Sequence, residues 1–133
     1  MRIDTDQYFG LKEHTEDQWA TAVYMLEKVN ALLTHLKWEY PLDPDTGTGI
    51  SGSRNGSGDG GFRLPTAITG SKTSAHKLAR AVDIYDPKDV LDESLNDNLL
   101  RQFGLYREHP GSTRGWVHLQ DIPPGSGRRT FIP

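Results

Sequence analysis

The chain has 133 residues, of which 35% are hydrophobic, and its formal net charge is −3. This length fits one domain, over residues 1–133, with a single core, and the 14 glycines and 8 prolines indicate long loops. The acidic balance argues against nucleic acid as the main partner, because nucleic-acid-binding domains carry a concentrated basic face. The lack of cysteine excludes disulfides, thiolate metal ligands and a cysteine nucleophile.

Two features bear on where the protein acts. No apolar run approaches the roughly 18 residues that a membrane-spanning helix needs, so we expect no membrane partner. The first ten residues, MRIDTDQYFG, lack the apolar stretch of a secretory signal peptide. The localisation stays open, and any export would depend on a partner, on lysis or on assembly into a particle.

The first strong element is a helix predicted over residues 16–37. The segment Thr15-Glu16-Asp17-Gln18 forms a capping-box pattern at its start. Apolar residues at helical spacing then predict a stripe that faces the core, made of Trp19, Val23, Leu26, Val29 or Asn30, Leu33 and Leu36. We assign this helix a scaffold role.

Shorter elements follow in the order expected of a small α+β domain. Residues 48–54 predict a strand that ends at Arg54, and the glycine-rich residues 55–61 predict a loop. Alternation over 79–85 predicts a strand that carries Asp83, residues 91–103 predict a second helix that Gly104 ends, and residues 116–120 predict a closing strand. We therefore expect a loop-rich fold with a small antiparallel sheet, flanked by a long N-terminal helix and a second helix.

Two histidines and one aspartate are the residues most informative about function: His76, Asp83 and His118. Such a set is a natural ligand group for Zn²⁺ with an open fourth position for water. Each residue alone has a structural explanation: His76 as a turn cap, Asp83 as an ion-pair partner of a nearby cation, His118 as a core imidazole. The spacing alone leaves both explanations open, because only the fold can bring the distant His118 to the other two residues.

Three blocks of sequence surround these residues: Ser51-Gly52-Ser53-Arg54, Ser74-Ala75-His76 continuing to Asp83-Ile84, and Trp116-Val117-His118. Their order and spacing resemble the zinc D-alanyl-D-alanine carboxypeptidases and the phage L-alanyl-D-glutamate endopeptidases, which form one family of peptidoglycan peptidases. The resemblance covers about residues 48–120. It implies His76, Asp83 and His118 as zinc ligands.

The same resemblance implies roles for further residues and a substrate. Arg54 would grip a substrate carboxylate or carbonyl, for which a guanidinium is well suited, and Ser74 would hold the substrate backbone or order the ligand loop. The implied substrate is the stem peptide of bacterial peptidoglycan. The implied source is a phage, with action like that of an endolysin or as part of the phage particle.

The chain departs from the family pattern at the group that handles the proton. Relatives place Glu or Asp three residues before the last histidine, or His two before it, but this chain has Gly115 and Trp116 there. Candidate substitutes are Glu108, His109 and Asp121. Of these we favour His109 as the general base, because the loop 107–115 can fold over the metal.

Two further hypotheses stay open beside the peptidase. The missing base favours a catalytically impaired module that keeps the fold and the metal, such as a cell-wall-binding part or a phage virion component. The second is a metal-free domain in which the pattern is vestigial. Elemental analysis of the purified protein separates this last hypothesis from the other two.

Overall fold

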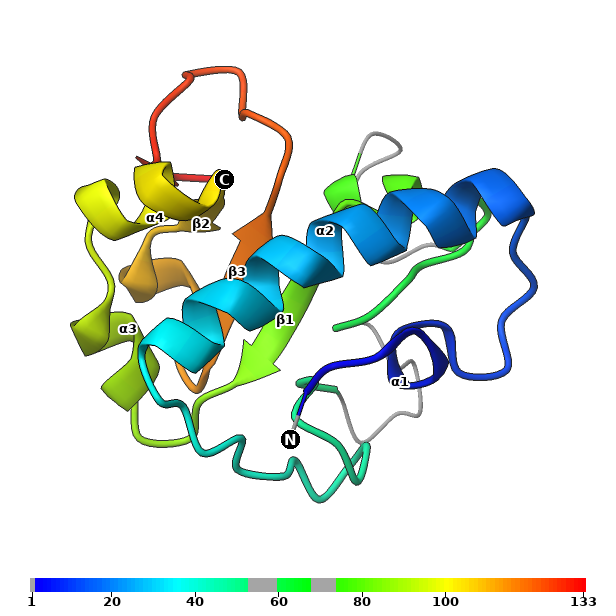
Figure 1. The fold of residues 1–133 in the computed structure, drawn as a ribbon, viewed down its shortest axis with the longest axis horizontal. Coiled ribbons are helices and arrows are strands. Elements are labelled where there is room, and N and C mark those ends of the chain that lie inside the picture. Colours follow the sequence, from blue (N-terminus) through cyan, green and yellow to red (C-terminus); the bar gives the residue numbers. More distant parts are fainter. Residues whose placement is uncertain (1, 53–59, 68–73) are drawn as a thin grey trace.

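The computed structural model describes residues 2–52, 60–67 and 74–133. These residues form an α+β fold with four α-helices and one four-stranded sheet (Figure 1). The strand order is β1-β3-β2-β4, with bounds of Ala81–Tyr85 for β1, Tyr106–Glu108 for β2, Trp116–Gln120 for β3 and Thr130–Phe131 for β4. The predicted fold class is confirmed. The antiparallel pairings join β1, β3 and β2, whereas β4 adds a short parallel edge beside β2.

The long helix α2, Glu16–His35, begins where its capping box predicts, with both reciprocal hydrogen bonds between Thr15 and Gln18 present. It ends two residues before the predicted end. Its buried face consists of Ala22, Met25, Leu26, Val29, Asn30, Leu32 and Leu33. The predicted stripe was wrong at Trp19, which is 47% exposed, because the helix meets the core only from its second turn onward.

The sheet has one apolar and one polar face. Val82 and Ile84 of β1 and Val117 and Leu119 of β3 are fully buried, and they belong to the same core cluster as the buried residues of α2. Because successive side chains in a strand point to opposite faces, Asp83 and His118 lie on the face away from this core. The two are direct cross-strand partners. The sheet thus separates a hydrophobic layer from a polar one.

Two predicted elements differ in the structure. The helix expected over 91–103 is two helices, α3 at Val90–Ser94 and α4 at Asp97–Phe103. The break arises because Leu95 is extended and Asn96 caps α4 by accepting a hydrogen bond from the backbone of Leu99. The strand expected over 48–54 is reduced, in its described part, to isolated bridges, one of which pairs Ile50 with Ile84.

A short helix near the N-terminus, α1 at Thr5–Phe9, was not predicted. Asp4 and Gln7 form a capping box at its start. Its buried Tyr8 reaches the sheet, where the phenol donates a hydrogen bond of 2.8 Å to the carbonyl of Ala81. None of the described helices combines the length and apolarity that crossing a bilayer requires.

Candidate metal centre

Three separate elements bring the predicted ligands together. His76 lies on a 3₁₀ helix, η1 at Ala75–Leu78, which leads into β1, where Asp83 lies. His118 lies on the neighbouring strand β3. The helix η1 ends at Ala79 in the left-handed conformation, with φ of 59°. This conformation favours glycine, but here an alanine adopts it.

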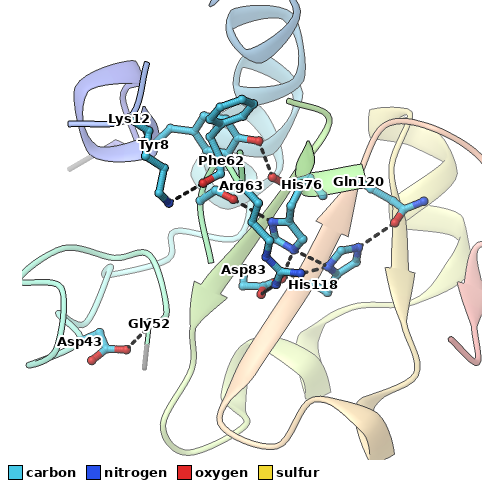
Figure 2. Close-up of polar contacts among 12 residues, drawn as sticks. Tyr8, Lys12, Asp43, Gly52, Phe62, Arg63, His76, Asp83, His118 and Gln120 are labelled. Atoms are coloured by element: carbon cyan, nitrogen blue, oxygen red, sulfur yellow. Dashed lines mark hydrogen bonds and ion pairs between the residues drawn. The ribbon is translucent and has the colours of Figure 1, made fainter. Parts of the chain in front are cut away.

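The ligand atoms of these residues form a small triangle, which Figure 2 shows. His76 Nε2 lies 3.2 Å from His118 Nδ1 and 3.2 Å from Asp83 Oδ1, and the third side, from His118 Nδ1 to Asp83 Oδ1, measures 2.9 Å. Ligands of a tetrahedral ion with bonds of about 2.05 Å lie about 3.3 Å apart. The three residues are only 2%, 8% and 5% exposed for His76, Asp83 and His118. The cluster can therefore hold a metal ion.

Hydrogen bonds on the outer side of each ring assign its tautomer. His76 Nδ1 lies 2.9 Å from the carbonyl of Gly61, and because a carbonyl only accepts, this nitrogen carries the hydrogen. His118 Nε2 lies 2.7 Å from Gln120 Oε1. The amide nitrogen of Gln120 donates to the carbonyl of Ile122 at 2.7 Å, which orients its oxygen toward the histidine. Partners of this kind fix and orient metal-binding histidines.

It follows that both inward-facing ring nitrogens carry lone pairs when the rings are neutral. These lone pairs and the Asp83 carboxylate converge in a buried space, where such an arrangement is unfavourable without a cation. A proton or a metal ion therefore has to occupy it. Two imidazoles and a carboxylate suit several divalent transition metals, so the geometry alone does not select one.

The charges of the cluster keep the carboxylate ionised. Burial by itself raises the pKa of Asp83, but the charges of His76 and His118 and their hydrogen bonds outweigh it and hold this pKa well below its ordinary range. Burial lowers the pKa of His118. Its hydrogen bond to Asp83, the charges of Asp83 and Glu108 and its hydrogen bond to Gln120 act in the opposite direction. Together they outweigh burial, so the pKa of His118 lies above its ordinary value. In the metal-free protein, the raised pKa favours the protonated form of His118.

A segment that the sequence predicts as a loop forms one wall of the centre. The carbonyl of Gly60 accepts from the backbone of Asp83 at 2.8 Å, and Gly61 provides the acceptor for His76. A Cβ at Gly61 would overlap with the carbonyl oxygen of Tyr8. The glycine pair therefore permits a close approach to the site and to α1, and this pair is the signal by which the wall could have been found.

The next residues of this wall bring a positive charge to the site. The backbone of Arg63 donates to the carbonyl of His76 at 3.2 Å, and its guanidinium Nη2 lies 3.9 Å from Asp83 Oδ2. The carbonyl of Phe62 accepts from the side chain of Lys12. Sequence reasoning missed Arg63, because nothing in its neighbourhood along the chain connects it to the ligands.

The other residues that the sequence predicted for the site are not among the three that converge. Ser74 precedes η1 and makes no side-chain capping bond, and Arg54 lies outside the described residues. His109 is exposed, and its Nδ1 accepts a hydrogen bond of 3.0 Å from the backbone of Gly111. Within the described residues, His109 is not part of the ligand cluster.

Comparisons with known proteins assign neither a family nor a function to this chain. Neither a family model, nor a curated protein, nor a solved structure matches the chain. The functional conclusion therefore depends on the geometry of the metal centre and on the motifs in the sequence.

Proposed function

We propose that this protein is a zinc-dependent peptidase that cleaves stem peptides of bacterial peptidoglycan, in the manner of a phage endolysin. The observation that carries the proposal is the convergence of two ring lone pairs and one carboxylate at a single buried point. Two histidines and one carboxylate form the ligand set of hydrolytic zinc sites, which keep one position for water or substrate. The peptidoglycan substrate follows from the motif resemblance.

The residues of the chain have distinct parts in such a reaction. When bound, zinc supplies Lewis-acid polarisation of the scissile carbonyl and of water. Gly61 and Gln120 hold the two imidazoles in the tautomers that ligation needs. Arg63 adds positive charge beside Asp83, which favours the approach of an anionic peptide end.

One observation favours a second candidate, a metal-binding module without turnover. The position three before His118 is Gly115, whose φ is 88°. Its backbone N–H donates a hydrogen bond to the side-chain carboxylate of Asp89. Trp116 follows it as the first residue of β3. Neither can transfer a proton, so the usual general base has no counterpart at these positions.

Elemental analysis of the purified protein is the first test. We expect about one zinc per chain in the wild type, a loss of at least tenfold in zinc affinity for His76→Ala, and no change for the control His109→Ala. The absence of metal from wild-type protein supplied with zinc would exclude this function.

A digestion assay is the second test. Zinc-loaded protein is incubated with peptidoglycan and with D-Ala-D-Ala peptides between about pH 5 and 9, and released amines are measured. Release that His76→Ala abolishes supports the peptidase. Zinc binding and co-sedimentation with cell walls without any release supports the module.

A further inference from the structure

Strand pairing places one carboxylate near His118, one of the three candidate ligands. In the antiparallel pair of β2 and β3, Arg107 is the partner of Leu119. One step further along the same register, Glu108 lies beside His118. Neighbouring residues of this kind have Cβ atoms about 5 Å apart. Arg107 points to the opposite face, where it donates to the carbonyl of Asp92, so Glu108 shares the polar face with His118.

The surroundings of Glu108 agree with this position. Its negative charge contributes to the raised pKa of His118. On its other side, Glu108 pairs with Phe131 of β4, whose ring meets the ring of His118 edge-on at 6.2 Å between centroids. Glu108 is half-buried, so part of the residue remains open to solvent.

The two other candidate bases are already engaged. His109 is exposed, follows Glu108 in the chain and uses its Nδ1 to accept from Gly111. The side chain of Asp121 is 1% exposed and pairs with Arg80 at 2.8 Å and with Lys28 at 3.5 Å. Neither of these side chains is a cross-strand neighbour of His118 in the sheet, whereas Glu108 is.

We propose that Glu108 is the carboxylate that accepts and returns the proton during peptide hydrolysis, an inference that rests on the proposed peptidase function. As the oxygen of the attacking water bonds to the scissile carbonyl carbon, one O–H bond breaks and the proton goes to Glu108. When the C–N bond breaks, Glu108 returns this proton to the leaving nitrogen. The adjacent strand thereby provides the function that Gly115 and Trp116 lack.

The test uses the full chain loaded with Co²⁺, whose absorption spectrum reports on ligands. The variants are Glu108→Gln, Glu108→Asp and the matched control Glu93→Gln, which changes an exposed glutamate of α3. We expect all of them to bind Co²⁺ within about twofold of the wild type. Glu108→Gln should cleave about 10²- to 10⁴-fold more slowly, Glu108→Asp should recover part of the rate, and Glu93→Gln should match the wild type.

A second readout does not depend on turnover. Acetohydroxamic acid gives up a proton when it ligates a metal, and a neighbouring carboxylate that accepts this proton strengthens binding. We therefore expect Glu108→Gln to weaken acetohydroxamate binding to the Co²⁺ protein at least tenfold, with no change for Glu93→Gln.

The outcomes separate this inference from the proposed function. Wild-type protein that fails to bind Co²⁺, or binds it without cleaving any peptidoglycan peptide, removes the peptidase and the role of Glu108 with it. Active wild-type protein whose Glu108→Gln variant cleaves and binds acetohydroxamate normally overturns the role of Glu108 alone. Loss of Co²⁺ binding in Glu108→Gln also overturns it, because the residue would then support the metal rather than the proton.

Discussion

At the scale of single residues, each histidine of the candidate centre uses one ring nitrogen for a hydrogen bond that orients the ring and turns the other toward the site that could hold a metal ion. His76 is held by a backbone carbonyl, and His118 is held by the side chain of Gln120, which is itself anchored to Ile122. The amide oxygen of Gln120 accepts the ring hydrogen of His118 and so fixes the tautomer without adding a negative charge to the site.

The first prediction concerns this amide. Gln120→Ala removes the acceptor that fixes the tautomer of His118, and we expect zinc affinity to fall about 10- to 100-fold, with the fold unchanged. Competition with a chromophoric chelator measures the affinity. The control is Gln102→Ala, which alters an exposed glutamine of α4; equal affinities for the two variants would contradict the assigned tautomer.

The second prediction concerns pH. Because the pKa of His118 is raised in the folded metal-free protein, its protonated form stabilises the fold below its unfolded pKa of about 6.5, and this contribution is lost as pH rises through the folded pKa. Asp83, with a lowered pKa, acts in the opposite sense: its contribution is present above its unfolded pKa and is lost only in strong acid. Metal ligation needs neutral His118, so metal affinity increases with pH.

We therefore expect the rise in melting temperature caused by zinc to increase from about pH 5.5 to pH 8. Thermal melts in EDTA and in excess zinc, at a series of pH values, measure it. A larger zinc effect at the acidic end would show that no proton is displaced from the centre.

At the scale of elements, local sequence patterns predicted the helix and strands in which the spacing of apolar residues matches the side that is buried. The capping box at Thr15 and the alternation in β1 and β3 were sufficient for α2 and for both strands that carry ligands. The wall at residues 60–63 has no such pattern. It is held by backbone bonds to Tyr8, His76 and Asp83, which are distant in sequence, so only the folded chain defines it.

The third prediction tests this wall. Gly61→Ala places a Cβ against the carbonyl oxygen of Tyr8, so the backbone has to shift, at a cost of about 1–3 kcal/mol in unfolding free energy. Since Gly61 also orients His76, zinc affinity should fall as well. Urea unfolding measures the first effect and chelator competition the second.

The control is Gly125→Ala, where a Cβ would meet nothing within 4 Å. This variant should match the wild type in both measurements. If Gly61→Ala behaves like Gly125→Ala, the segment does not support the centre in the way that its contacts indicate.

At the scale of the whole molecule, the metal centre and the hydrophobic core lie on opposite faces of one sheet. The core cluster joins residues of α1, α2, α3, α4 and the strands, including Phe9, Met25, Leu91, Leu100 and Leu119. The metal ligands are outside this cluster. The fold therefore has a source of stability that does not depend on the metal.

The fourth prediction follows from this separation. Metal removal with EDTA should leave the far-UV circular dichroism spectrum unchanged and lower the melting temperature, because a ligand at 100 times its Kd stabilises by about 2.7 kcal/mol. Structural zinc domains, in contrast, unfold without the metal. Loss of the helical signal in EDTA would assign the ion a structural role in this protein.

The sequence by itself determined the α+β class, the start of α2, the strands that carry Asp83 and His118, and the three residues of the candidate metal centre, because each depends on a short-range pattern or on residue chemistry. Only the tertiary structure decided the tautomers, the wall at residues 60–63 and the proximity of Arg63 to the centre. It also gave different positions to Glu108 and His109, which are adjacent in the chain: Glu108 is half-buried in β2, whereas His109 is exposed. That difference depends on strand register, which places one side chain beside His118, and register is set by pairing between segments that the sequence keeps apart.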